Sequence, residues 1–411
     1  MPRVMLLIPS ASYRAPDFMA AASRLGVEVV VGTDRRNPLQ DAEAGRLIAL
    51  DFMQPEHGAD QIEAFATMYP LDTIVAVDDG GTLLAAHAAR RLELPHNGVA
   101  AVEATRDKSM MRARLEAAGI PSPDWCVLPT SIDPIAAAAT LDYPVVVKPL
   151  ALSASRGVIR ADTPEEFVDA FHRVTAILAM PEATEECGEA FADRVLVEGY
   201  IPGIEVSIEA LLDDGALRVL AIFDKPDPLV GPFFEETIYV TPSRLSDADQ
   251  RLLVATTEAT CSALGLTHGA VHAELRLHEG VAYPIDVAAR SIGGLCSRTL
   301  DFGTGMSLEE LILRHAIGAE VRTYERDAQA AGVMMIPIPR AGTLRAVRGV
   351  EDAEAVPLIA SVTIFIRPGG IVVPLPEGTE YLGFIFARGD RPEGVEQALR
   401  DAHAAITFEI E

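Results

Sequence analysis

Positive charge is scarce in this sequence. The chain has 34 lysine and arginine residues against 60 aspartate and glutamate residues, which gives a net charge of -26 at pH 7. A surface of this sign repels phosphate backbones and anionic lipids. We therefore expect no nucleic-acid partner and no membrane attachment. An anionic small molecule would bind only where lysines, arginines or metal ions overcome the overall field.

Long apolar runs and paired cysteines are lacking too. No stretch of about 18 apolar residues occurs, so no segment is expected to cross a membrane. The first residues, MPRVMLLIPS, resemble a short β-strand more than a signal peptide. The sequence has four cysteines, none in a CxxC pair: Cys126, Cys187, Cys261 and Cys296. This usage favours buried reduced thiols. Together these features predict a cytoplasmic protein.

Several nucleotide, metal and hydrolase motifs are missing. No GxGxxG follows the first apolar run, and no GxxxxGK[ST] loop occurs, which argues against a dinucleotide site and a P-loop. Neither HExxH nor GxSxG is found. The isolated histidines His96, His268, His272 and His315 form no HxH or HExxH pair, so zinc is not expected.

The first hundred residues alternate between strand and helix patterns. The apolar runs RVMLLIP, VEVVVGTD and LDTIVAVDD are separated or followed by helical segments, which predicts a parallel α/β domain over residues 1–104. Ligands of such sheets bind at the carboxyl ends of the strands. The polar residues at these ends are Ser10, Ser12, Asp34, Asp78 and Asp79.

Two further regions follow. Residues 105–330 mix helices with strands and include a subdomain at about 125–205. After residue 330 the chain becomes rich in β-segments punctuated by Gly and Pro, which suggests a separate C-terminal domain over 331–411. The predicted fold class is therefore α/β and α+β.

Two lysines have positions suited to phosphate. Lys148 ends the apolar run VVVKP, directly before the loop ALSASRGV, whose backbone N–H groups and hydroxyls suit a polyphosphate. Lys108 follows Arg106 and Asp107 at a helix start. Either lysine alone is equally explained as a solvated surface residue. Downstream, Glu198 and Glu205 flank the turn in VLVEGYIPGIE, where they could bind ribose hydroxyls and an adenine edge or be exposed turn acids.

The hairpin HAELRLHEGVAYPIDVAARSIGG is the strongest single signal. Glu274 and Asp286 stand on consecutive strands, twelve residues apart, and can face one another across the ladder. Paired carboxylates suit Mg²⁺, which takes one or two protein carboxylates together with phosphate oxygens. The alternative is a structural ion pair between Glu274 and Arg290.

In this order, the segments RDK, VVVKP, SRGV, VLVEGYIPGIE, HAELRL and PIDVAAR resemble the ATP-grasp superfamily over about residues 1 to 330. The later segments GTLRAVRG and RPGGIVVPLPEGTEYLGFIFARG resemble the L-amino-acid ligase group. This resemblance implies an ATP-grasp architecture: an N-terminal parallel α/β domain, a central ATP-binding lid region and a C-terminal α+β portion. It also implies a carboxylate–amine ligase that uses ATP and Mg²⁺, passes through an acylphosphate and releases ADP and phosphate.

The resemblance also implies roles for individual residues. The residues expected at ATP are Lys108, Lys148, Ser153, Ser155, Arg156, Gly157, Glu198, Ile201 and Glu205. Glu274 and Asp286 would hold Mg²⁺. Arg290 would stabilise charge on the acylphosphate and the tetrahedral intermediate, consistent with the needs of phosphoryl transfer.

The substrate side departs from the family pattern. Ala288 stands where many relatives have a metal-binding Asn, and Tyr239 stands where the group often has His. Glu236 would pair with a substrate ammonium. Lys225 either faces the same cavity or is an ordinary loop lysine. Gly293 and Gly294 either let a ligand approach the backbone closely, which implies a roomy acyl pocket, or form a simple turn.

The expected partners are a small-molecule carboxylate and an amine, and a homodimer is the expected assembly. Two other functions stay open. One is an ATP-grasp enzyme of a nucleotide pathway, although that would favour a more basic N-terminal domain than VAVDDGG offers. The other is a nucleotide-binding protein without ligase activity, supported only by Ala288.

Overall fold

The computed structural model describes residues 1–10, 12–35, 45–303 and 305–411. Within these residues the N-terminal part forms a parallel sheet, which confirms the predicted α/β domain. Its strands, in sheet order, are β3 (Leu47–Ala49), β2 (Glu28–Thr33), β1 (Arg3–Leu7) and β4 (Thr73–Ala76). Its helices are α1 (Ala15–Leu25), α2 (Pro55–Ala66) and α3 (Asp79–Arg91).

Local sequence explains how α1 starts and stops. Pro16 lies in its first turn, where a missing N–H costs nothing. Gly26 ends the helix in the left-handed conformation, at φ 65°, and its N–H caps the last carbonyls. The chain then enters β2. Because β2 and β4 both run parallel to β1, the carboxyl ends of the three strands lie at one edge of the sheet.

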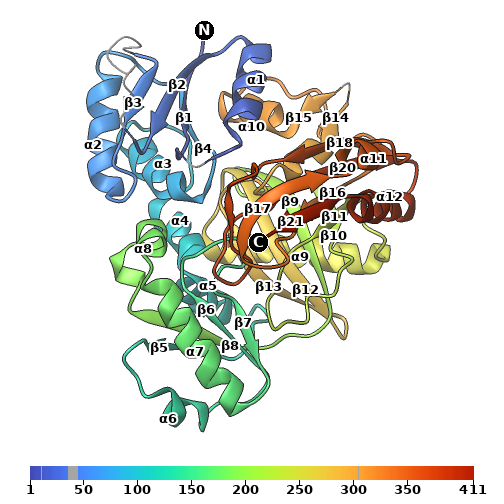
Figure 1. Cartoon of the computed structure of the whole chain (residues 1–411). Coiled ribbons are helices and arrows are strands. Elements are labelled where there is room, and N and C mark those ends of the chain that lie inside the picture. Colours follow the sequence, from blue (N-terminus) through green and yellow to red (C-terminus); the bar gives the residue numbers. More distant parts are fainter. Residues whose placement is uncertain (11, 36–44, 304) are drawn as a thin grey trace.

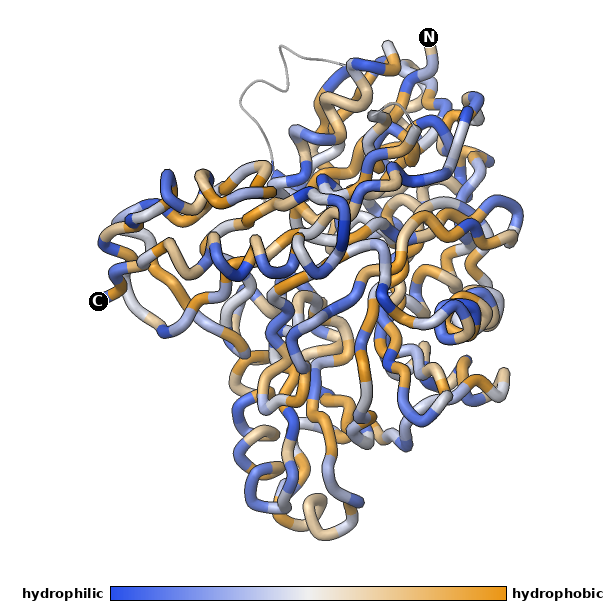
Figure 2. The backbone as a smooth tube through the Cα atoms, turned by 90° about the vertical axis from the view of Figure 1, so that its right-hand side faces the viewer, coloured by the Kyte–Doolittle hydropathy of each residue, from blue (hydrophilic) through white to orange (hydrophobic). Residues whose placement is uncertain are grey.

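Two helices, α4 (Val99–Arg106) and α5 (Lys108–Ala117), lead from this domain into a second sheet. This sheet and its helices form a subdomain, here called the lid, that projects below the other parts of the chain in both views (Figures 1 and 2). Its strands, in sheet order, are β5 (Trp125–Pro129), β8 (Arg194–Gly199), β6 (Val145–Pro149) and β7 (Ile159–Ala161). Its helices are α6 (Pro134–Ala138), α7 (Pro164–Leu178) and α8 (Pro181–Cys187), followed by the short helix η1 (Glu189–Phe191).

An antiparallel sheet forms the centre of the molecule. Among the described residues its strands, in sheet order, are β13 (Val281–Ala288), β12 (Gly269–His278), β9 (Ile204–Asp213), β10 (Ala216–Asp224), β11 (Ile238–Thr241), β16 (Ala330–Ile336), β20 (Gly383–Gly389) and β18 (Ile359–Ile364). The helix α9 (Asp247–Leu264) packs on it and is capped by the Ser246 hydroxyl, which accepts from Asp249 N–H. The segment after β13 holds η2 (Cys296–Thr299), β14 (Asp301–Phe302), β15 (Met306–Ser307) and α10 (Leu308–Ala316).

The C-terminal segment contributes strands to two sheets. Strands β16, β18 and β20 continue the central sheet, because β16 pairs with β11. The remaining strands, β19 (Ile371–Val372), β17 (Gly342–Arg348) and β21 (Thr407–Ile410), form a small separate sheet, with helices α11 (Val350–Glu354) and α12 (Pro392–Ala405) alongside. Gly and Pro mark the turns here, and turns reveal nothing about which sheet a strand joins.

The parts share their apolar cores. One cluster of buried side chains joins Phe18 of the N-terminal domain to Leu311 of α10 and Phe384 of β20. Such continuity makes the N-terminal and C-terminal parts pack as one body around the central sheet. No helix in the described residues is long and apolar enough to cross a membrane. All four cysteines, each within the described residues, are free; Cys187, Cys261 and Cys296 are buried as predicted, whereas Cys126 is only half-buried.

Candidate active site

A cavity of about 1460 Å³ lies where the N-terminal domain, lid, central sheet and C-terminal segment meet. The carboxyl ends of the N-terminal strands reach it through Ser10, Asp34 and Asp78, as the topology of a parallel sheet requires. Every predicted site residue except Arg156 and Gly157 lines this cavity. The site is therefore built from residues between 9 and 381 in the chain.

At the lid end, Lys148 and Glu198 are buried against one another. Lys148 Nζ lies 2.6 Å from Glu198 Oε2, and the Arg112 guanidinium of α5 donates to both oxygens of the same carboxylate. Burial alone would raise the pKa of Glu198, but Arg112 and Lys148 lower it to about 2. Burial lowers the pKa of Lys148, opposed by Glu198. Two basic groups thus share one carboxylate at this end.

Lys108 joins the lid end to the hairpin. Its Nζ donates to the carbonyl of Leu152, at 3.2 Å, and lies 3.5 Å from Asp286 Oδ2. Asp107 precedes it as the N-cap of α5, accepting from the N–H groups of Ser109 and Met110, so the start of α5 is held in place. The predicted phosphate and metal residues therefore meet at this lysine.

The loop after Lys148 is only partly directed at the cavity. Ser153 and Ser155 line it, whereas Arg156 donates instead to the Glu186 carboxylate and the Glu377 carbonyl. Ala154 and Ser155 adopt left-handed conformations, at φ 53° and 55°. Glu186 also accepts from the N–H and the hydroxyl of Ser153. Glu186 was not predicted, because it lies in a segment with no motif.

The predicted hairpin is confirmed in detail. Strands β12 and β13 are antiparallel, and Glu274 stands directly opposite Asp286. A bulge follows at Leu275, where the register shifts. The two carboxylates nevertheless have different partners, since Asp286 faces Lys108 and Glu274 faces an acidic cluster.

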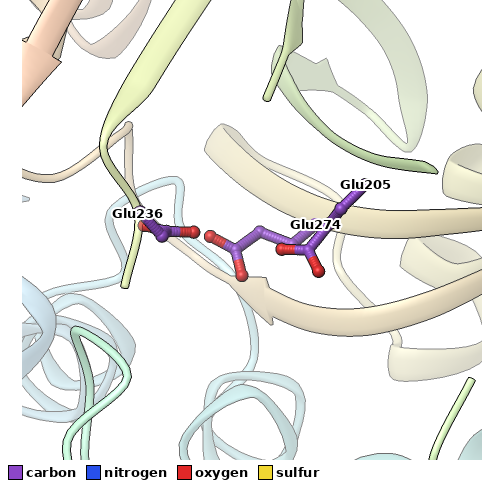
Figure 3. Close-up of side chains that lie close together, drawn as sticks. All are labelled: Glu205, Glu236 and Glu274. Carbon is purple, nitrogen blue, oxygen red and sulfur yellow. The ribbon is translucent and has the colours of Figure 1, made fainter. Parts of the chain in front are cut away.

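This cluster is formed by Glu205, Glu236 and Glu274, whose carboxylates point towards one another (Figure 3). Lys225 Nζ lies 2.8 Å from Glu205 and 3.3 Å from Glu274, and it also contacts Glu236. Lys225 thus does not line the cavity itself, and it is not an ordinary loop lysine either, because it is buried against three carboxylates that do line it. Although burial opposes charge on Lys225, the three carboxylates raise its pKa well above the ordinary value. Burial and Glu274 raise the pKa of Glu236 to about 7.

Glu205 is held on its other side by Arg276. The Arg276 guanidinium donates to Glu205 Oε2 at 2.7 Å and to the carbonyls of Ile201 and Leu229. Ile201 and Glu205 both line the cavity, as predicted for residues near the nucleoside. Arg276 itself was missed, because its position in HAELRL resembles that of an exposed strand residue.

His272 and Glu209, which were not predicted as a pair, lie behind Glu274. His272 contacts the fully buried Glu209 through Nδ1 and lies 3.3 Å from Glu274 Oε1 through Nε2. Burial opposes charge on the imidazole, but Glu209 and Glu274 raise the pKa of His272 to about 9. Glu209 also accepts from Ile292 N–H, at 2.9 Å. This pair therefore holds Glu274 and the segment after Arg290 in one arrangement.

Arg290 contacts the N-terminal domain. It donates to Asp79 Oδ2 at 2.6 Å, and Arg106 lies 3.6 Å from the other oxygen. Burial alone would raise the pKa of Asp79, but both arginines hold it well below the ordinary value. Arg14 adds a further link by donating to Ser291 Oγ, at 2.7 Å. The predicted catalytic arginine is thus oriented by the first residue of α3.

The substrate side of the cavity has apolar and aromatic walls. Tyr239 and Tyr381 line it together with Met335, next to the predicted Gly293 and Gly294. Burial raises the pKa of both tyrosines well above the ordinary value, so their hydroxyls stay protonated. Both glycines line the cavity, which leaves room close to the backbone.

Three family models match consecutive parts of the chain. They are an ATP-grasp N-terminal domain over residues 19–96, an ATP-grasp domain over 141–299 and an L-amino acid ligase C-terminal domain 2 over 334–411. The three stretches lie in the N-terminal domain, in the lid with the central sheet, and in the C-terminal segment. The matched stretches fit the architecture described above.

Among curated relatives, alanine–anticapsin ligase of Bacillus subtilis is 31% identical over 269 residues, covering 63% of this chain and 56% of its own length. D-alanine–D-alanine ligase of Pseudomonas fluorescens is 28% identical over 176 residues, or 41% of this chain and 49% of its own. The chain spans 56% to 64% of the length of the first curated relatives it matches.

Among solved structures, an L-amino acid ligase from Bacillus licheniformis matches with a TM-score of 0.84 and 26% identity, covering 100% of this chain and 99% of that one. Phosphoribosylglycinamide synthetase from Anaerococcus prevotii shares the fold, with a TM-score of 0.68 and 17% identity over the whole of both chains. These findings confirm the resemblance seen in the sequence. The chain carries an ATP-grasp N-terminal domain, an ATP-grasp core domain and a C-terminal domain of the L-amino acid ligase type.

Proposed function

We propose that this protein is an ATP- and Mg²⁺-dependent ligase that joins an amino-acid carboxylate to an amine and releases ADP and phosphate. The observation that carries the proposal is the contact of Lys108 with Asp286, 3.5 Å apart. It joins the basic end of the cavity, suited to phosphates, to the acidic hairpin, suited to a cation. A phosphoryl group and a carboxylate acceptor must meet at such a junction.

The reaction has two displacements. A carboxylate oxygen of the first substrate attacks the γ-phosphorus of ATP, the bond to the β-phosphate oxygen breaks, and ADP leaves. The amine nitrogen then attacks the acyl carbon, phosphate leaves, and the nitrogen loses a proton. Lys108 and Lys148 would neutralise phosphate oxygens, with Ser153 and Ser155 beside them. Arg290, held by Asp79, would stabilise charge at the acyl centre.

The residues present fit Mg²⁺. Glu274 and Asp286 offer hard oxygen ligands from directly opposed positions on β12 and β13. An ion held by these residues would supply positive charge next to the phosphate oxygens. Ala288 supplies no oxygen from its side chain, so water or phosphate would complete the coordination. His272 and Lys225, both within 3.3 Å of Glu274 Oε1, would orient its carboxylate.

The amino-acid substrate would lie at the acidic end. Glu236 is the member of the acidic cluster for which no basic contact other than Lys225 is found among the described residues. Its carboxylate would therefore pair with the substrate ammonium, and Tyr239 and Tyr381 would face the side chain. The names of the ligases among the relatives support amino acids as substrates. A cytoplasmic location and a homodimer remain predictions.

A nucleotide-pathway substrate has less support. The structures of that kind share the fold at 13% to 17% identity. The strand ends facing the cavity carry Asp34, Asp51 and Asp78, which would repel a phosphorylated substrate.

The test is mass spectrometry of the products formed from ATP, Mg²⁺ and a pooled amino-acid mixture, with ADP release followed in parallel. We expect a dipeptide or amide together with an equal amount of ADP. Tight ATP binding without any product would instead favour a nucleotide-binding protein that has lost catalysis.

Amino acids of graded size then sharpen the answer. Because Gly293 and Gly294 line the cavity, a bulky side chain should be accepted. Strict preference for glycine or alanine in ADP release would contradict a roomy acyl pocket.

A further inference from the structure

The segment 374–381, between β19 and β20, contacts two parts of the protein at once. Thr379 and Tyr381 line the cavity, while Pro376 and Glu377 touch the lid. It joins regions more than two hundred residues apart, because Glu377 lies 204 residues from Arg173 in the sequence. No motif in the sequence indicates this contact.

The side-chain contact is bidentate. Arg173, on helix α7 of the lid, donates from Nε to Glu377 Oε1 at 2.6 Å and from Nη2 to Oε2 at 2.9 Å. Its guanidinium also lies over the ring of Phe233, 4.8 Å from the centroid. The paired geometry fixes the direction of both side chains, which a single contact would not.

The backbone of the same segment holds the loop before β7. The Pro376 carbonyl accepts from Gly157 N–H at 2.9 Å, and the Glu377 carbonyl accepts from Arg156 Nε at 3.2 Å. Gly157 has φ 72°, and a Cβ there would approach Pro149 to 2.8 Å. A residue with a side chain would be strained at this position, so the path of the backbone here requires glycine.

We infer that Glu377 is a positioning residue for the ATP-phosphate loop. The Glu377 side chain holds Arg173 on helix α7, and the Glu377 carbonyl accepts from Arg156. The neighbouring Pro376 carbonyl accepts from Gly157 N–H. Ser153 and Ser155 are thereby kept at the cavity. The same segment supplies Thr379 and Tyr381 to the substrate side, so the contact couples the position of the lid to the wall of the substrate pocket.

The expected change in KM for ATP rests on the proposed function, whereas the expected change in deuterium exchange of the loop does not. Arg173 and Glu377 are 43% and 27% exposed, so solvent screens their interaction. An exposed pair of this kind shifts an equilibrium by at most about fivefold. Glu377 does not touch the cavity, and its loss is expected to change ATP retention rather than the chemical step.

The test is a charge-reversal cycle: Glu377→Arg, Arg173→Glu and the double variant, with Glu377→Gln as a mild replacement in case a reversal does not fold. The matched control is the pair Arg348 and Glu409, which joins β17 to β21 at 2.7 Å and lies on exposed strands away from the lid. Its reversal, Arg348→Glu with Glu409→Arg, changes the same charges elsewhere.

Two readouts separate the inference from the proposed function. Deuterium exchange over residues 153–158 is measured without ligand, and KM for ATP and kcat are measured with ligand. We expect each single reversal to speed exchange and raise KM for ATP about threefold to fivefold, with kcat nearly unchanged. The double variant should return both to within about twofold of the unaltered protein, because the pair is restored with opposite polarity.

Exchange and KM that stay at control values in both single reversals would overturn the inference. So would a double variant that is no better than the single ones, since the pairing would then not be the cause. If the unaltered protein binds no ATP, the proposed function fails, yet exchange in the ligand-free variants still decides the role of Glu377.

Discussion

The two ends of the cavity have opposite charge balances. At the lid end one carboxylate, Glu198, is shared by two bases, Arg112 and Lys148. At the acidic end four carboxylates share three bases. The carboxylates are Glu205, Glu209, Glu236 and Glu274, and the bases are Lys225, His272 and Arg276.

Under the proposed function, this difference would let a strongly acidic protein bind an anionic nucleotide. A surplus of positive charge lies at the lid end, where burial strengthens its attraction for phosphate. The surplus of negative charge lies at the other end, where it suits a metal ion or a substrate ammonium. Lys108, between Leu152 and Asp286, marks the boundary. Variants at both ends of the cavity test this contrast.

Lys225→Met should have the largest effect. It removes the base shared by three carboxylates, and loss of one partner of a buried pair costs about 3–5 kcal/mol of unfolding free energy. Lys148→Met is the matched change at the other end, where Arg112 still neutralises Glu198, so it should cost less stability but more ATP affinity. Urea unfolding and ATP titration of both variants check this; equal losses in both would contradict the contrast.

Arg290→Met should abolish product formation while ATP binding is largely retained. Removing one charge-stabilising donor typically lowers kcat about 100- to 1000-fold. Product mass spectrometry and ATP titration measure the two properties separately. Arg348→Met, on an exposed strand, serves as the control. Unchanged turnover would refute the role assigned to Arg290.

Glu198→Gln should flatten the acid dependence of stability. The pKa of Glu198 is lowered from an ordinary 4.5 to about 2, so its stabilisation is present above pH 4.5 and is lost as pH falls towards 2. That difference corresponds to about 3 kcal/mol of unfolding free energy. Denaturant unfolding between pH 4.5 and 2 measures it. The exposed Glu409→Gln should behave like the unaltered protein, and an equally steep loss in Glu198→Gln would count against the pairing.

His272→Gln should have the smallest effect. It removes the group that holds Glu274 from behind, and such partners typically change metal affinity about tenfold. Calorimetry of Mg²⁺ with an ATP analogue measures this without turnover. His278→Gln, on the same strand β12 but beside the turn, is the control. Equal Mg²⁺ affinity in both variants would show that His272 is only structural.

The features that depend on residues close together in the sequence were predicted. The alternation of strands and helices was enough for the N-terminal domain, and a twelve-residue spacing placed Glu274 opposite Asp286. The loop after Lys148 and the strand ends at the cavity were also found. Each of these rests on residues close in sequence, where periodicity and turns carry the information.

The missed residues depend on distant partners. Arg112 is 86 residues from Glu198, and Arg276 is 71 residues from Glu205. Each arginine stands in a segment that is equally compatible with an exposed surface. Likewise, an isolated His272 gave no sign of Glu209, because only the register of β9 and β12 brings them together. Ion networks of this kind follow from topology rather than from local pattern.

The pairing of β11 with β16 has a consequence for how this chain can be taken apart. A chain cut after residue 330 would lose β16, β18 and β20, and β11 would become an unpaired edge strand. The apolar side chains of Ile238 and Val240 would then be exposed. Such an edge invites pairing with other chains. The C-terminal part therefore cannot be exchanged as an independent unit, because a replacement would have to supply three strands of the central sheet and their pairing with β11.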